Sequence, residues 1–428
     1  MNGGDLKIAA MSRRTFVSLG TAALVADSCS ADVRVSSPAL FTGWHPGEFQ
    51  VHFIYTGVAE SLFVICPDST SMLIDCGDIP AIMRRPYDVP VPRPREMAGE
   101  TVANYVLKAN PRGQDVDYLV VSHWHSDHTG TPNWQSCGTM VDRSGGRYWR
   151  SGFGIAAEKL RFAKAIDRGF DEPIEFVDGS GRSAEHMRRL YSFLAERDGL
   201  VREKVRLGAT DQFRQRHGGS DGFFVRTVAA NGKVAAPDGS VRDLYAKFLA
   251  DHPGTTLLNE NGLSIGLLFG YGPFRFFTAG DFCDRLDGVP TEDGLAGVCE
   301  PVDVAKINHH GHHSMSEKLV AALKARCYAA CVWDQLHITD DTMTRLADRR
   351  LYPGPRTFYP GVFTAERQRE DAERAWTRDV APALRSVGGH VVLTVEPGGR
   401  AYTMTCLDTS SETMVVSSVD HYRTRGAG

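Results

Sequence analysis

The segment from Asp117 to His128 constrains this chain most, because an apolar run leads directly into a dense cluster of metal-ligand side chains. Residues 117–122 (DYLVVS) have the composition of a buried strand. The next six residues (HWHSDH) contain three histidines and one aspartate. Alternate side chains of an extended chain point the same way, so His123 and His125 can approach one metal together. Asp127 and His128 lie where the chain begins to turn and can reach a second metal.

The nature of these ligands indicates which metals the site would hold. Imidazole and carboxylate suit zinc, and also manganese or iron. The alternative is a set of polar residues that caps the start of a helix, but three histidines in six residues favour metal binding. We therefore predict two divalent metal ions, with Zn²⁺ first and Mn²⁺ or iron as the other choices.

Two further segments end apolar strands with ligand side chains. Asp281 follows Thr278-Ala279-Gly280, where the small Gly280 allows close backbone approach, and its carboxylate is suited to bridge two metals. His309 and His310 follow the apolar run 302–307. We expect one histidine of this pair to bind metal and the other to contact substrate, and the sequence leaves open which is which.

Asp75 ends an earlier strand, predicted over residues 71–75. Its carboxylate is suited to hold a ligand histidine or the ligand loop by hydrogen bonds. An ordinary turn aspartate is the competing interpretation.

The remaining pattern alternates short strands with helices. Strands are predicted over 51–55, 61–65, 117–122, 263–270, 274–278, 302–307, 328–333, 390–396 and 401–406, and helices over 96–109, 155–168, 183–198, 317–326 and 364–383. Strands in both halves predict an α/β protein with two mixed sheets packed face to face and helices outside. We assign residues 31–408 to one domain, with a helical insertion at about 131–253, and expect the tail 409–428 to be loose.

The N-terminus has the features of an export signal. Arg13-Arg14 precede a short apolar run over 17–26, which is typical of the twin-arginine route and assigns residues 1–30 to a signal peptide. We therefore expect an exported protein, periplasmic or extracellular; the alternative is a cytoplasmic protein with a frayed N-terminal helix. No apolar run reaches the length needed to span a bilayer.

The charge balance bears on the partners. The formal net charge is -4, so the composition does not support a nucleic-acid partner, although a local basic helix such as 186–189 leaves one open. A small-molecule or cell-envelope ester substrate fits the composition better.

These segments, in this order, resemble the metallo-β-lactamase superfamily. The closer resemblance is to its ComEC-like branch, the metallohydrolase domain of DNA-uptake competence proteins and their soluble relatives. The matching stretches are 51–57 (VHFIYTG), 72–77 (MLIDCG), 123–128 (HWHSDH), 259–265 (NENGLSI), 278–281 (TAGD) and 304–314 (VAKINHHGHHS), with Leu336-His337 like the branch's later histidine. The resemblance implies an αββα four-layer sandwich with a two-metal site between the sheets.

The sequence departs from the branch in several places. Residues 57–61 (GVAES) replace a glycine-glutamine-glycine-aspartate loop, and the later His-Pro becomes His337-Ile338. The third histidine of other superfamily members is not identifiable. His186, His217 and His252 lie in the right interval, and we expect each to be a surface residue.

The predicted chemistry is hydrolysis by a hydroxide held between two metals, with Asp281 as the bridge and attack on a phosphoryl or carbonyl centre. Two divalent metals, two ligand carboxylates and one hydroxide leave a positive site, which favours an anionic ester, a phosphodiester first. Asp127, His310 and His337 are the predicted catalytic side chains. The alternatives are a lactone, lactam or thioester hydrolase of the same fold and a non-catalytic metal-binding module.

Overall fold

The computed structural model describes residues 39–79, 91–93, 96–131, 139–143, 146–171, 180–334, 337–359, 375–385, 389–410 and 412–427. The predicted export signal over 1–30 lies outside these residues. So does most of the helix predicted over 364–383, of which α10 (Ala375–Val380) is described.

The first sheet has ten strands in the order β1-β20-β19-β18-β2-β3-β4-β5-β8-β9. Four neighbours, β4, β5, β8 and β9, run parallel, and the other pairs are antiparallel. The strands are β1 (Ala39–Leu40), β2 (Phe49–Phe53), β3 (Leu62–Ile65), β4 (Ser71–Ile74), β5 (Asp115–Val120), β8 (Arg161–Asp167), β9 (Val201–Lys204), β18 (His390–Val395), β19 (Ala401–Leu407) and β20 (Val415–Arg423).

The second sheet has eight strands in the order β12-β11-β10-β13-β14-β15-β16-β17. From β14 to β17 the strands run parallel. The strands are β10 (Phe223–Ala230), β11 (Lys233–Ala235), β12 (Val241–Asp243), β13 (Gly266–Tyr271), β14 (Phe274–Thr278), β15 (Val304–Lys306), β16 (Cys327–Ala329) and β17 (Thr357–Tyr359). A separate hairpin pairs β6 (Thr139–Arg143) with β7 (Gly146–Arg150).

One apolar core joins the two sheets. Alternate residues of β2, Phe49, Val51 and Phe53, point into it because side chains of a strand alternate between faces. The ring of Phe49 stacks on Phe269 of the second sheet at 5.7 Å between centroids, and Phe53 meets Phe276 edge-on at 6.0 Å. The sheets are therefore packed face to face, as predicted.

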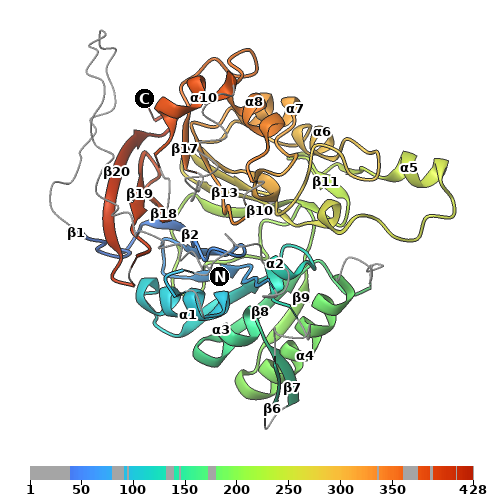
Figure 1. The fold of residues 1–428 in the computed structure, drawn as a ribbon, viewed down its shortest axis with the longest axis vertical. Helices are drawn as coiled ribbons and strands as arrows, with labels where there is room; N and C mark the ends of the chain where they lie inside the picture. The colour runs from blue at the N-terminus through green and yellow to red at the C-terminus, as the bar shows by residue number, and fades with distance from the viewer. Residues whose placement is uncertain are drawn as a thin grey trace, which may run out of the picture.

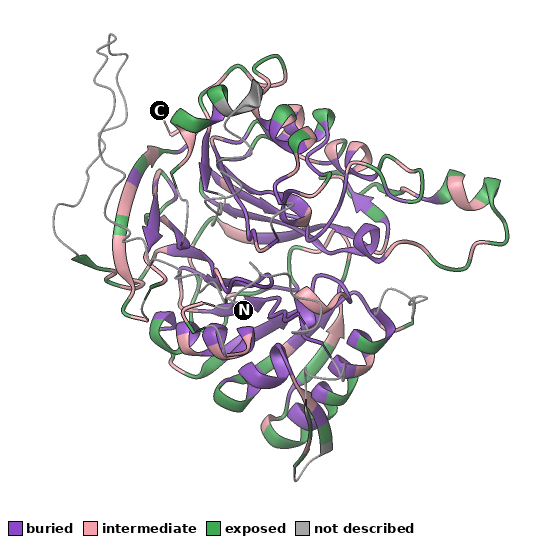
Figure 2. Ribbon diagram, in the orientation of Figure 1, coloured by how far each residue is buried: buried purple, intermediate pink, exposed green. Residues whose placement is uncertain are grey.

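Helices cover both outer faces (Figure 1). The first sheet carries α1 (Ala98–Ala109), α3 (Phe153–Lys159) and α4 (Ser180–Asp198), which share a second apolar cluster with it. The second sheet carries α6 (Thr291–Ala296), α7 (Glu317–Leu323) and α8 (Asp340–Ala347) around a third cluster. Figure 2 shows the buried residues concentrated in the strands and on the inner sides of these helices. The architecture is thus the αββα four-layer sandwich that the sequence predicts.

The region 131–253 differs from the helical insertion expected there. The helix predicted over 155–168 ends at Lys159, and the chain then forms β8. Further on, β9 extends the first sheet and β10, β11 and β12 form one side of the second. The two alanines, Arg161 and Lys164 of β8 favour a helix in isolation, but parallel pairing with β5 buries Phe162 and Ile166, and tertiary context overrides propensity.

The tail after residue 408 is also ordered, contrary to the expectation of a loose end. Strand β20 pairs with β19 from Ala401↔Arg423 to Leu407↔Val416. Its sequence, VVSSVDHYR, is rich in β-branched and aromatic residues that suit a half-buried sheet edge. Among the described residues, no helix combines the length and apolar character that crossing a bilayer requires.

Candidate metal centre

The predicted ligands meet at one edge of the sandwich because each follows the carboxyl end of a strand. His123 to His128 follow β5 of the first sheet and lead through α2 (Ser126–Thr129). Asp281 follows β14 and the His309-His310 pair follows β15, and these two strands are parallel neighbours in the second sheet. The packing of the sheets brings three distant segments together.

Four side chains form the centre of the site. Ligand atoms of Asp127, His128, Asp281 and His310 all lie within 4.8 Å of one another. The Asp281 Oδ2 atom is 3.1 Å from His128 Nε2 and 3.3 Å from His310 Nε2. The same His310 nitrogen is 3.1 Å from Asp127 Oδ2. One divalent cation can therefore be reached by side chains from three segments.

His123 and His125 adjoin the same group. The His123 Nε2 atom is 3.9 Å from Asp281 Oδ2 and 3.1 Å from His125 Nδ1. The rings of His123 and His128 are 4.2 Å apart between centroids. His123 and His125 therefore extend the cluster of imidazoles around the Asp281 carboxylate.

The Asp281 carboxylate supplies the observation that tests whether cations fit. Its Oδ1 atom is buried and has no hydrogen-bond partner in the part of the chain that the structure describes. A buried carboxylate oxygen without a donor is unfavourable unless a cation satisfies it. Imidazole nitrogens and carboxylate oxygens are also the donors that zinc, manganese and iron accept. The residues present fit divalent cations, with Asp281 among the ligands.

The protonation of these residues supports the same conclusion. Burial lowers the pKa of His128, but Asp281, Asp127 and Asp75 together raise it well above its ordinary value. Burial raises the pKa of Asp281, but His128 and His310 more than offset this and hold it well below its usual range. Protons on the imidazoles balance the buried carboxylates when no cation is bound. A cation would take over that role and release them.

Asp75 orients one of the central histidines. The His128 Nδ1–H donates to Asp75 Oδ2 at 2.8 Å, which turns Nε2 toward Asp281. Asp75 also accepts the Ser122 backbone N–H at 2.8 Å and the Ser122 hydroxyl at 2.6 Å. Of the two interpretations of Asp75, the structure favours the residue that holds a ligand histidine and its loop.

Glu60 and Lys306 complete the site, and the sequence did not single out either for such a role. Glu60 Oε1 is 2.9 Å from Lys306 Nζ, and Glu60 Oε2 is 3.2 Å from His310 Nδ1. Both side chains are at most 1% exposed. Glu60 lies in the segment 57–61, where the sequence departs from the ComEC-like pattern. The available signal was Lys306 itself, because a lysine inside the apolar strand β15 needs a buried partner.

The structure separates the roles of His309 and His310. His310 is 1% exposed and lies among the carboxylates. His309 is 21% exposed, and its Nε2 is 3.9 Å from Asp281 Oδ2. Its Nδ1 faces the Cys283 thiol and the His312 carbonyl oxygen, both at 2.9 Å. His310 is therefore in the position of a ligand, and His309 lies on the accessible side.

His337 adjoins the same group. Its ring stacks on His310 at 5.1 Å between centroids with 20° between the planes. Burial, together with the charges of His310 and His309, holds the pKa of His337 well below its usual range. All the predicted site residues are thus brought together.

No third histidine of the superfamily type joins this cluster among the described residues. The expectation of three surface residues is wrong for His186, which is fully buried with its Nε2 3.2 Å from the Ser151 carbonyl oxygen. His217 forms an ion pair with Asp117 at 2.9 Å, and His252 is exposed. Burial of His186 follows from its place on the inner face of α4, which the sequence pattern did not resolve.

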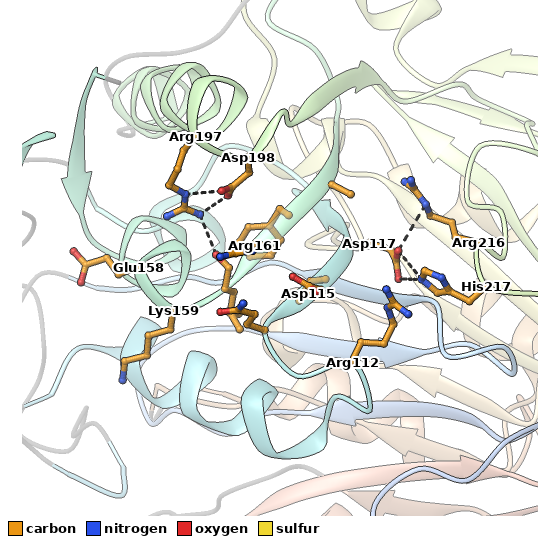
Figure 3. Close-up of a pocket in the computed structure, with 15 residues that line it drawn as sticks. Arg112, Asp115, Asp117, Glu158, Lys159, Arg161, Arg197, Asp198, Arg216 and His217 are labelled. Atoms are coloured by element: carbon orange, nitrogen blue, oxygen red, sulfur yellow. Dashed lines mark hydrogen bonds and ion pairs between the residues drawn. The ribbon is translucent and has the colours of Figure 1, made fainter. Parts of the chain in front are cut away.

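A cavity of about 790 Å³ lies elsewhere (Figure 3). It lies at the opposite, amino-terminal ends of β5 and β8 and contains none of the site residues. Charged residues dominate its lining: Arg112, Asp115, Asp117, Glu158, Lys159, Arg161, Arg197, Asp198, Arg216 and His217. Many of these charges are paired within it, for example Arg216 with Asp117. This cavity offers no metal-ligand cluster.

The fold and the site define a class: an αββα-sandwich protein with a buried His/Asp cluster suited to divalent metals. Neither the protein-family models nor the curated proteins include a match to this chain. Among solved structures, the chain is similar to the Zn²⁺-bound PqqB from Methylobacterium extorquens. The two are 11% identical, with a TM-score of 0.33 over 67% of this chain and 81% of that chain.

Proposed function

We propose that this protein is a divalent-metal-dependent hydrolase that acts on an anionic ester, a phosphodiester first. The observation that carries the proposal is Asp281, a buried carboxylate whose Oδ2 atom lies 3.1 Å from His128 Nε2, 3.3 Å from His310 Nε2 and 3.9 Å from His123 Nε2. Its second oxygen lacks a donor among the described residues. A buried carboxylate with one unsatisfied oxygen and several imidazoles around it is what a divalent-cation site requires.

The charge of the site favours an anionic substrate. Lys306 balances Glu60, which leaves Asp75, Asp127 and Asp281 as the carboxylates that cations must neutralise. Two divalent cations exceed three carboxylates by one positive charge while the bound water is still protonated, and this charge attracts an anionic ester. When bound, such cations supply Lewis-acid chemistry and lower the pKa of a coordinated water toward ~7.

The residues of the chain have separate tasks in this proposal. Asp127, His128, Asp281 and His310 would hold one cation, which would supply Lewis-acid chemistry. His309, on the accessible side, is placed to contact the ester. His337 is neutral at neutral pH, because its pKa lies well below the usual range. The Asp334 backbone N–H faces His337 Nδ1 at 3.4 Å, which assigns the proton to Nε2, so this ring would donate a hydrogen bond to a developing oxyanion.

We also propose that the protein acts outside the cytoplasmic membrane after export by the twin-arginine route. The paired arginines at 13 and 14 before the apolar run 17–26 support this location. A cell-envelope ester or a small exported molecule is then the expected class of substrate.

The test is a substrate panel with purified protein reconstituted in turn with Zn²⁺, Mn²⁺ and Fe²⁺. We expect turnover of bis(p-nitrophenyl) phosphate, loss of that turnover in Asp127→Ala, and no change in Asp198→Asn at the opposite end. Turnover of a chromogenic lactam or lactone alone would replace the phosphodiester proposal with the carboxylic-bond alternative. Stoichiometric metal without turnover of any ester would contradict the enzyme and leave a metal-binding module.

A further inference from the structure

A buried ion pair joins the two sheets directly behind the metal-ligand loop. Glu260 begins the 3-10 helix η1 (Glu260–Leu263), which leads into β13 of the second sheet. Arg168 follows β8 of the first sheet. The Arg168 Nε donates to Glu260 Oε1 and its Nη2 donates to Glu260 Oε2, both at 2.6 Å, and the two side chains are 0% and 1% exposed. Two parallel hydrogen bonds fix both position and orientation.

Glu260 also holds the ligand loop itself. Its Oε1 atom accepts the backbone N–H of Trp124 at 2.8 Å. Trp124 is the residue between His123 and His125. This bond therefore fixes the backbone that carries both imidazoles. The Ser122 carbonyl, one residue before His123, accepts the backbone N–H of Ile265 at 2.9 Å. The segment that leads into β13 is thus hydrogen-bonded to the loop both before and after His123.

The side chain of Trp124 is fixed from the Arg168 side. Its indole N–H donates to the Gly169 carbonyl oxygen at 3.2 Å, and its ring stacks on Phe170 at 4.8 Å with 11° between the planes. Asn231 braces the same turn, because its Nδ2 donates to the Arg168 carbonyl oxygen at 2.8 Å. The loop carrying His123 and His125 is therefore held by the ion pair and not by its own hydrogen bonds alone.

The two sides of the metal centre depend on this support to different degrees. Asp127, His128, Asp281 and His310 come from three segments and are close in space. His123 and His125 instead come from one loop, the one that Glu260 holds, and His123 Nε2 lies 3.9 Å from Asp281 Oδ2. Ligands from a single loop rely on the pre-organisation of that loop.

We propose that Glu260 is a positioning residue that sets the affinity of the His123–His125 side of the centre, through the Trp124 amide and the Arg168 ion pair. This inference rests on the proposed metal centre and deepens it. It predicts two unequal metal sites, of which the His123–His125 site alone responds to changes at Glu260.

The test is a Co²⁺ titration of the metal-free full chain, followed by the visible absorption of the bound ion. We expect two binding steps in the wild type. In Glu260→Gln the weaker step should lose affinity by about tenfold or more, and the stronger step should keep its affinity and spectrum. The half-buried ion-pair residue Glu203, 2.7 Å from Lys164 and outside the metal-ligand segments, supplies the control Glu203→Gln, which should titrate like the wild type.

A double variant separates positioning from stability. Breaking a buried pair leaves a lone charge and destabilises the fold, whereas replacing both partners with apolar residues of similar size keeps stability. Arg168→Met combined with Glu260→Leu should therefore unfold near the wild-type temperature and still show the weakened step, because the Trp124 amide has lost its acceptor. Two wild-type steps in the folded double variant would overturn the role of Glu260. A wild-type chain that binds no Co²⁺ would instead overturn the metal centre on which that role rests.

Discussion

The two ends of the parallel strands β5 and β8 carry many charged side chains, yet only one end has the arrangement of a reactive site. At the amino-terminal ends, arginines and acids line the open cavity of about 790 Å³ (Figure 3). At the carboxyl ends, imidazoles and carboxylates are buried against one another. Cavity volume alone would assign the reactive site to the amino-terminal ends. Burial and unbalanced charge assign it to the carboxyl ends.

A matched pair of residue types makes the difference concrete. At the open end, His217 pairs with Asp117 at 2.9 Å, and the histidine is 23% exposed. At the buried end, His128 pairs with Asp75 at 2.8 Å, and neither side chain is more than 1% exposed. Solvent screens the charges of the first pair, so this pair contributes little to the stability of the fold. The second pair is shielded from water, so its charges must be balanced by other groups, and cations do this best.

Removal of the central carboxylate is expected to have the largest effect. In Asp281→Asn the bridge between the two groups of imidazoles loses its charge, so the metal content should fall and phosphodiester turnover should drop by about a thousandfold, the equivalent of several kcal/mol. Elemental analysis and kcat/KM for bis(p-nitrophenyl) phosphate measure both. Asp198→Asn, at the open end, serves as the control. Equal losses of metal and turnover in Asp281→Asn and Asp198→Asn would contradict the assignment of the reactive site to the carboxyl ends.

Weakening the support of one ligand should have a smaller effect. Asp75→Asn keeps an acceptor for the His128 N–H but removes its charge, and we expect metal affinity to fall by about 10- to 100-fold. Competition with a coloured chelator gives the affinity. The exposed Asp115 in the open cavity provides Asp115→Asn as the matched variant. An unchanged metal affinity in Asp75→Asn would show that Asp75 is an ordinary turn aspartate with no role in positioning His128.

Burial should also distinguish histidines away from the metal. Burial, with a contribution from His390, lowers the pKa of His52 to about 3. The unfolded chain, with an ordinary pKa near 6.5, therefore binds more protons between those two values, and stability is present above pH ~6.5 and lost as pH falls. Between pH 6 and pH 5 we expect a loss of about 1 kcal/mol from His52.

Urea unfolding at both pH values measures this loss. His52→Gln should lose less stability than the wild type over the same interval. Identical pH dependence in the two proteins would contradict the assignment of His52 as a buried neutral imidazole.

The smallest effect is expected in the open cavity. Arg161 is exposed at its edge, and substitutions at such sites usually change stability by no more than about 0.5 kcal/mol. Arg161→Ala should therefore leave both the free energy of unfolding and phosphodiester turnover unchanged. A marked rise in KM for this variant would show that the substrate reaches this cavity and that the two ends are less distinct than proposed.

The sequence predicted which segments meet where a candidate ligand directly follows an apolar strand. His123, Asp281 and the His309-His310 pair come together in this way, because the carboxyl ends of neighbouring strands meet at one edge. The fold class followed from the same strands. Glu60 and the Arg168–Glu260 pair were not predicted, since their partners are distant in the chain and carry no local pattern. Strands β8 and β20 were missed because pairing with β5 and β19 decides their structure.

The central claim is that the carboxylate at residue 281 lies between two bound cations, and anomalous diffraction from crystals grown with Zn²⁺ tests it most directly. Data collected on both sides of the zinc absorption edge should show density beside Asp281, one peak toward His128 and His310 and a second toward His123 and His125. Well-ordered crystals without zinc density at Asp281, or with zinc only at His217 and Asp117, would contradict the account.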